Sequence, residues 1–153
     1  MTADRYAGLV SRVVALLIDV LLLIVGNAAV YLVLIEGSGL MLGGTPSWAR
    51  PLAGVLSGVL PTAYFTLAWW LTGQTAGGVA MGVVVTSADG SRVGLLRALL
   101  RALVGLALAP LWLIGMITIL IDGRRRALLD MLFGTVVTYG GARPNPVIRP
   151  QTG

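Results

Sequence analysis

Residues 11–25 read SRVVALLIDVLLLIV, an apolar run that is interrupted by a single carboxylate, Asp19. The apolar run covers residues 13–35. At about 1.5 Å of rise per residue it is long enough to cross a bilayer core about 30 Å thick. A charged side chain inside such a run costs on the order of 2.5–3.5 kcal/mol on insertion scales, so it generally has a partner or a task. The sequence therefore predicts a membrane-spanning helix whose acid is either paired or functional.

The composition of the chain also indicates a membrane protein. Of its 153 residues, 57% are hydrophobic and only 11% are charged, whereas a soluble domain contains about 25% charged residues. The chain has no Cys and no His, which excludes disulfides, thiolate or imidazole metal sites, and catalysis by Cys or His of this chain alone. We therefore expect no cofactor, no bound metal and no enzymatic activity.

A second apolar run, residues 52–71, predicts a second span. Pro61 lies in its middle, where it would free a backbone carbonyl and kink the helix. Gly54 and Gly58 form a G-x-x-x-G pair, which lets another helix approach closely, either within the chain or in a homodimer. Residues 36–50, between the two runs, are rich in glycine and are predicted to form a loop.

Two short stretches rich in β-branched residues predict β-strands. The first is residues 81–86, which a turn follows at residues 88–91, and the second is residues 134–139. A lone strand beside a membrane would leave its backbone groups unpaired. We therefore predict that these two strands pair with each other.

The third apolar run, residues 95–121, is interrupted by Pro110. A single crossing would place the two strands on opposite sides of the membrane and would put Arg124, Arg125 and Arg126 outside, against the positive-inside rule. A re-entrant or interfacial helical hairpin that bends near Pro110 avoids both problems, because each arm of about 12 residues is too short to span. The sequence favours this hairpin over a third span. The predicted fold is thus an all-α membrane protein with a small cytoplasmic two-stranded β element.

The positions of the arginines predict the orientation of the chain. All eleven basic residues are arginines, and they cluster at the ends of apolar runs rather than on a basic face with aromatic residues. This pattern indicates contact with the lipid bilayer and orientation within it rather than binding to nucleic acid. The excess of Arg, Ala, Gly, Val and Leu, with no Lys, suggests a bacterial genome of high GC content. We therefore expect a bacterial plasma-membrane protein with both termini in the cytoplasm and a flexible tail rich in Gly, Pro and Arg at residues 140–153.

Three interpretations of Asp19 stay open. It could form a structural ion pair with an arginine from another segment, or it could serve proton or cation transport with Asn27, Thr62 or Thr66 as polar lining. In the third interpretation the arginines bind an anionic lipid headgroup. The candidate partners of Asp19 or of a headgroup are Arg97, Arg101, Arg124, Arg125 and Arg126.

Two further acids, Asp122 and Asp130, flank the arginine triplet at residues 124–126. Either acid could cap the N-terminus of a short helix. Asp130 could also pair with Asp19, although nothing in the spacing requires it.

Three segments of the chain together resemble the RDD family of small bacterial membrane proteins, which is named for an Arg and two Asp residues. The segments read AGLVSRVVALLIDVLLL, LTGQTAGGVAMGVVVTSADGSRVGLLRALLR and LIDGRRRALLDMLFGTVVTY. They run from Ala7 to Tyr139, and their order and spacing carry the resemblance. It implies that Arg12 and Asp19 are the first two family residues and that Asp130, or alternatively Asp122, is the third.

The resemblance implies a membrane domain over residues 1–139 and a role connected with transport. Gly78 stands where a basic residue commonly follows the GQTxG turn, and Leu129 stands where a His commonly precedes the second aspartate. Ion handling that depends on those two residues is therefore not expected here. Because the chain is small, we expect an accessory or stabilising subunit that associates with other membrane subunits or with itself. The alternative is a proton- or cation-coupled transporter that acts as a homo-oligomer.

Overall fold

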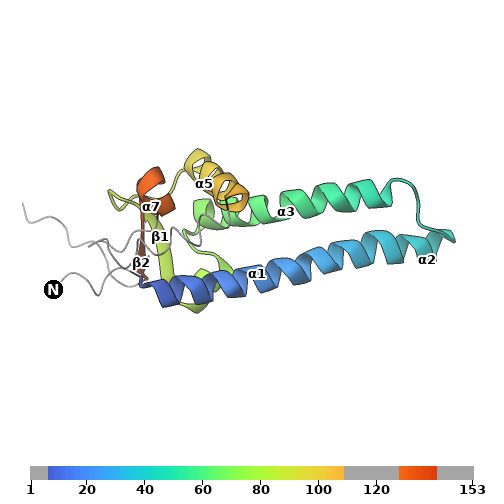
Figure 1. The fold of residues 1–153 in the computed structure, drawn as a ribbon, viewed down its shortest axis with the longest axis horizontal. Helices are drawn as coiled ribbons and strands as arrows, with labels where there is room; N and C mark the ends of the chain where they lie inside the picture. The colour runs from blue at the N-terminus through green and yellow to red at the C-terminus, as the bar shows by residue number, and fades with distance from the viewer. Residues whose placement is uncertain (1–6, 109–127, 141–153) are drawn as a thin grey trace, which may run out of the picture.

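The computed structural model of the chain describes residues 7–108 and 128–140. Its first helical segment consists of α1 (Leu9–Tyr31), a π-helical stretch (Leu32–Gly37) and α2 (Ser38–Leu42). A second long helix, α3 (Ala49–Leu71), runs back beside the first and completes a helical hairpin (Figure 1).

Both arms of the hairpin are long and apolar enough to cross a membrane. The first arm has 34 residues and the second has 23, against the roughly 20 residues that a bilayer core requires. Only 11% of the apolar window in the first arm and 17% of that in the second is buried inside the protein. A core helix of a soluble domain would be mostly buried, so both arms are candidate membrane-spanning helices, as the sequence predicts.

The first arm is longer than the sequence indicates. The prediction of a loop over residues 36–50 is wrong for its first part, because the chain stays helical to Leu42. Ser38 Oγ donates a hydrogen bond to the carbonyl of Leu34, so this polar residue is accommodated within the helix. Gly43 then ends the helix at a φ of 72°, a left-handed conformation that glycine adopts without steric cost. Gly and Ser disfavour helix by only about 1 kcal/mol or less, which a strongly helical context overrides.

The two predicted strands pair, which confirms that expectation. β1 (Val83–Ser87) and β2 (Thr135–Tyr139) form one antiparallel sheet, with Val85 opposite Val137 at its centre. The observed bounds differ from the predicted ones by at most two residues. Because the strands lie side by side, the chain leaves β1 and returns to β2 at the same end of the molecule (Figure 1).

Three short helices gather at the end of the hairpin where α1 begins and α3 ends (Figure 1). They are α4 (Ala76–Ala80), α5 (Leu95–Ala107) and α7 (Leu128–Phe133). Helix α4 packs on α1, α5 packs on α3, and α7 packs on β2. The sequence analysis predicts no helix for the segment that contains α4.

The buried core lies at this same end. Its members are Ala7, Ala15, Val83, Val85, Val93, Ala98 and Val137, with Trp69 and Met81 packed against them. Along the rest of the hairpin, large apolar side chains such as Leu21, Ile24 and Val55 are exposed. The core therefore holds one end of the hairpin together, whereas the rest of its two helices exposes apolar side chains.

The predicted hairpin at residues 95–121 lies only partly within the described residues. Helix α5 covers its first part, whereas the bend expected at Pro110 falls outside, so the hairpin stays a prediction. The other expected features outside the described part are Asp122, Arg124, Arg125, Arg126 and the tail from residue 141.

Candidate functional site

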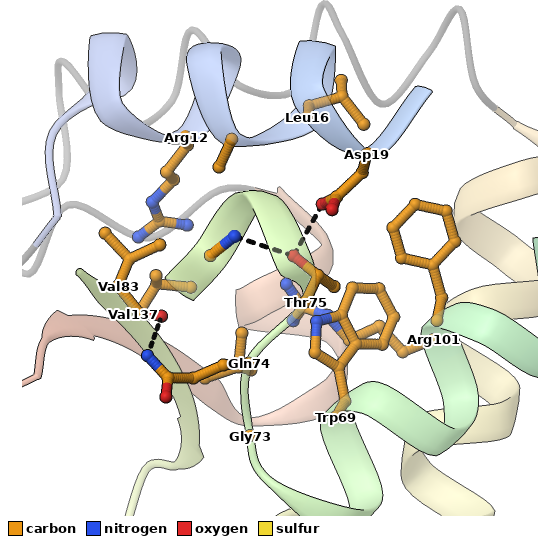
Figure 2. A pocket seen from close by; sticks show the side chains of 14 residues that line it. Arg12, Leu16, Asp19, Trp69, Gly73, Gln74, Thr75, Val83, Arg101 and Val137 are labelled. Carbon is orange, nitrogen blue, oxygen red and sulfur yellow. Dashed lines mark hydrogen bonds between the residues drawn. The ribbon is translucent and has the colours of Figure 1, made fainter. Parts of the chain in front are cut away.

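The charged residues of α1 lie on the face of the helix that is buried in the protein. Arg12, Ala15 and Asp19 are the buried residues of this helix, and spacings of three and four residues place them in one row. Arg12 is 7% exposed and Asp19 is 3% exposed. Both side chains point away from α1 toward the segment that carries Thr75 and Val83 (Figure 2).

Asp19 accepts three hydrogen bonds from two other parts of the chain. The hydroxyl of Tyr64, on α3, and the backbone N–H of Gly77, on α4, each donate to Oδ1 at 2.7 Å. Thr75 Oγ1 donates to Oδ2 at 2.6 Å (Figure 2). A carboxylate has about four acceptor positions, so these bonds use most of its capacity. Asp19 thereby connects α1 to both α3 and α4.

The same contacts fix the start of α4. Thr75 is the N-cap of this helix, and its hydroxyl oxygen accepts a hydrogen bond from the N–H of Gly78 at 3.0 Å. The hydroxyl oxygen of Tyr64 accepts one from the N–H of Ala76 at 2.9 Å. The N–H groups in the first turn of a helix need acceptors from outside the helix, and negative charge there is favourable. Asp19 therefore caps α4 from a neighbouring helix.

Two glycines allow α4 to pack closely against its neighbours, Gly77 against α1 and Gly78 against the segments that carry Thr75 and Val83. A Cβ on Gly77 would lie 1.9 Å from the carbonyl oxygen of Ala15, so a side chain there would separate the two helices. A Cβ on Gly78 would lie 3.2 Å from both Thr75 Oγ1 and the carbonyl oxygen of Val83. Glycine at residue 78, which departs from the usual family pattern, thus suits the tight packing of this segment.

A second polar cluster joins α1, α5 and α7. Asp130, on α7, is 0% exposed and forms ion pairs with Arg12 and with Arg101, the latter at an N–O distance of 2.6 Å. Thr135, at the start of β2, accepts a hydrogen bond from Arg101 Nη1 and donates one to Asp130 Oδ1 at 3.4 Å. Two buried guanidinium groups thus share this carboxylate. Pairing of this kind offsets the several kcal/mol that burial of an isolated charge costs.

Trp69, on α3, supports the second cluster from another side. The guanidinium carbon of Arg101 lies 4.9 Å from the centroid of the Trp69 ring, which is a cation–π geometry. Phe65 packs beside Trp69, with ring centroids 5.2 Å apart. Arg101 Nε is buried without a hydrogen-bond partner among the residues that the structure describes. Trp69 and Arg101 therefore connect α3 to α5.

The two clusters line a common cavity of about 70 Å³. Its polar lining consists of Arg12, Asp19, Gln74, Thr75 and Arg101 (Figure 2). A water molecule needs about 10–15 Å³ of such space, so the cavity has room for a few water molecules and not for a large solute.

The predicted site residues separate into two groups. Among the described arginines none pairs with Asp19: Arg101 pairs with Asp130, and Arg97 donates a hydrogen bond to Ser87 at 2.9 Å. Asp19 is satisfied by hydroxyl and backbone donors, which do not require burial of a second full charge. Asp130 lies within the first turn of α7 rather than at its cap, and it contacts arginines rather than Asp19.

The glycine pair predicted to pack against another helix has no such partner in the described chain. A Cβ built on Gly54 or Gly58 would meet no neighbouring atom within 4 Å, and both residues are exposed. Asn27, which was considered as polar lining, donates a hydrogen bond to the carbonyl of Leu23 in its own helix and does not line the cavity.

Sequence reasoning missed the three donors to Asp19, although the sequence carries a signal for each of them. The segment GQTAGG combines a helix-capping Thr75 with Gly77, which has no side chain to block a close approach. Tyr64 has a polar tip within an apolar run, where a hydroxyl generally needs a partner. Nothing in the sequence alone indicates that these residues converge on Asp19.

The apolar hairpin, with buried charges confined to one end, is the arrangement of an integral membrane protein. Its Arg12, Asp19 and Asp130 supply one arginine and two aspartates on two interacting helices. The model of the RDD family matches residues 6–134, so the chain belongs to the RDD family, as the sequence resemblance indicates. No curated protein and no solved structure matches the chain in the corresponding searches.

Proposed function

We propose that this RDD family protein is a multipass protein of the bacterial plasma membrane with a non-enzymatic, transport-associated role. In this proposal it serves as an accessory or stabilising subunit of a larger membrane assembly. The observation that supports this most is the environment of Asp19, whose carboxylate is occupied by donors from Tyr64, Thr75 and Gly77. An acid held in this way is suited to fastening helices together rather than to exchanging an ion.

The position of the arginines supports an orientation with the sheet in the cytoplasm. Among the described residues, Arg12, Arg97 and Arg101 lie at the sheet end of the hairpin, whereas Arg50 lies at the opposite tip (Figure 1). Arginine near membrane ends favours the cytoplasmic side. Because β1 and β2 pair, both strands lie on the same side of the membrane in this orientation.

The surface of α3 offers a place for a membrane partner. Gly54 and Gly58 are exposed one turn apart, and nothing in the described chain covers them. Small residues at this spacing let a second helix approach closely in a bilayer. We propose that this strip contacts another subunit.

The test is purification of the full chain from its native membranes in mild detergent, followed by mass spectrometry of the proteins that accompany it. We expect a specific partner that is lost with Gly54→Leu or Gly58→Leu. Val55→Leu, at an exposed position of the same helix, is the matched control and should retain the partner. Recovery of the chain alone, as a small homo-oligomer, would argue against the subunit role.

The alternative, a proton- or cation-coupled transporter acting as a homo-oligomer, is favoured by one observation. Arg12, Asp19 and Arg101 line one cavity next to a candidate span. This alternative predicts ion flux into liposomes that contain only the purified chain, and loss of that flux in a folded Asp19→Asn variant. The subunit role predicts no flux above that of empty liposomes.

A further inference from the structure

A groove of about 720 Å³ lies where the start of α5 faces α7 and the turn after β1. None of the residues that line this groove belongs to the clusters around Asp19 and Asp130. The part of its lining that matters here combines two arginines with four large apolar side chains. These residues are Arg92, Leu96, Arg97, Leu100, Leu132 and Phe133. Such a combination fits an amphiphilic ligand.

The apolar part of the groove continues over the outer side of α5. Leu96 is 69% exposed, Leu100 43% and Leu103 45%, whereas Ala98 on the opposite side of the helix is buried against the core. Helix α5 lies across the end of α3 at the sheet end of the hairpin (Figure 1). An amphipathic helix at the end of a span places its leucines at the level of the acyl chains and its arginines at the headgroups.

The polar part of the groove carries a net positive charge. Arg92 and Arg97 are both exposed, and the acid in the lining is Asp89. Hydrogen bonds from the hydroxyl and backbone N–H of Ser91, at 2.7 and 2.9 Å, hold the pKa of Asp89 below its usual value. Asp89 is therefore ionised at neutral pH, and among the described lining residues two arginines against one aspartate leave a charge of +1.

The start of α5 adds to this attraction for anions. Its N-cap is Gly94, which provides no side-chain cap, and its first turn contains no acid. Helix N-termini favour negative charge because their first N–H groups lack partners within the helix. The two arginines and the apolar side chains of its lining distinguish this groove from a helix N-terminus alone.

We propose that the groove binds one anionic phospholipid, with the phosphate between Arg92 and Arg97 and an acyl chain along Leu96, Leu100 and Leu132. An anionic phospholipid matches the positive charge and covers the leucines at once. A soluble phosphate would match only the charge.

This lipid site differs from the headgroup site that the sequence suggests. That hypothesis includes Arg101, but Arg101 is buried in its ion pair with Asp130. Arg92 takes its place, because the turn after β1 brings it into the same groove as Arg97.

The proposal can be tested on the purified full chain in an uncharged detergent, with native mass spectrometry and thermal unfolding as readouts. Phosphatidylglycerol is compared with phosphatidylcholine of the same acyl chains, and inorganic phosphate is the soluble probe. We expect one tightly bound phosphatidylglycerol and a raised Tm with that lipid only. Removal of both charges by Arg92→Gln with Arg97→Gln should weaken binding about tenfold or more.

Two variants serve as controls for charge and position. Asp89→Asn, which removes the acid of the groove, should tighten binding of phosphatidylglycerol. Arg50→Gln, at the opposite tip of the hairpin, should leave it unchanged. Equal binding of phosphatidylcholine, unchanged binding in the double variant, or an equal Tm shift with inorganic phosphate would each overturn the proposal. The arginines are exposed, and size-exclusion chromatography of the double variant checks that it is folded.

Discussion

At the scale of single residues, the chain holds its buried charges in two different ways. Asp19 lies in an apolar helix and is satisfied by Tyr64, Thr75 and Gly77, without an opposite charge among the described residues. Asp130 is instead paired with the two buried guanidinium groups of Arg12 and Arg101. An ion pair with an arginine is one of the three interpretations of Asp19 that the sequence leaves open, but the hydroxyl and backbone donors that converge on it become apparent only in three dimensions.

The paired acid should matter strongly for stability. Asp130→Ala would leave Arg12 and Arg101 buried without their shared carboxylate, and breaking a buried pair in this way costs about 3–5 kcal/mol. We expect a loss of this size in the free energy of unfolding, measured in mixed detergent micelles. Glu36→Gln, at an exposed acid far from the cluster, should change it little. Equal effects of the two substitutions would contradict the assigned role of Asp130.

At the scale of elements, the sequence predicts the features that long apolar patterns indicate and misses those that depend on tertiary contacts. Apolar length indicates both arms of the hairpin, and the need to pair backbone groups indicates the sheet of β1 and β2. The end of the first arm is misplaced because helix propensity is a weak guide at Gly37 and Ser38. Helix α4 has only five residues, too few for a periodic pattern, and it is held by its capping residue and by α1.

The close packing of α4 on α1 can be tested with a single methyl group. Gly77→Ala would place a Cβ 1.9 Å from the Ala15 carbonyl oxygen, so one helix must move. Overpacking of this kind costs about 1–3 kcal/mol. Gly54→Ala is the matched control, because its Cβ meets nothing and alanine favours helix by roughly 0.5–1 kcal/mol. Thermal unfolding that ranks Gly77→Ala as no less stable than Gly54→Ala would contradict the packing described here.

At the scale of the whole molecule, the chain consists of an apolar hairpin with a polar end. The buried ion pairs, the sheet and the contacts of Asp19 all lie where α1 begins and α3 ends (Figure 1). This division suits a protein whose apolar helical hairpin lies in lipid and whose sheet and short helices lie at one membrane surface. Asp19 fastens that end to the hairpin through its hydrogen bonds with Tyr64, Thr75 and Gly77.

The proposed orientation of the molecule leads to a labelling prediction. The chain has no native cysteine, so Thr45→Cys at the tip and Ala88→Cys in the turn after β1 each create a single thiol. In intact cells we expect a membrane-impermeant thiol reagent to label the tip variant only, because the turn faces the cytoplasm. The turn variant should react after the membrane is permeabilised. Labelling of the turn variant in intact cells would contradict the orientation.

The most direct test of the role of Asp19 is a double-mutant cycle with its partner Thr75. The free energy of unfolding is measured for Asp19→Asn, Thr75→Val and the double variant. Because Thr75 Oγ1 donates to the Asp19 carboxylate at 2.6 Å, we predict a coupling energy of about 1.5–3 kcal/mol, typical of a hydrogen bond to a charged group. Additive losses, with a coupling below about 0.5 kcal/mol, would show that Asp19 does not fasten α4 to α1.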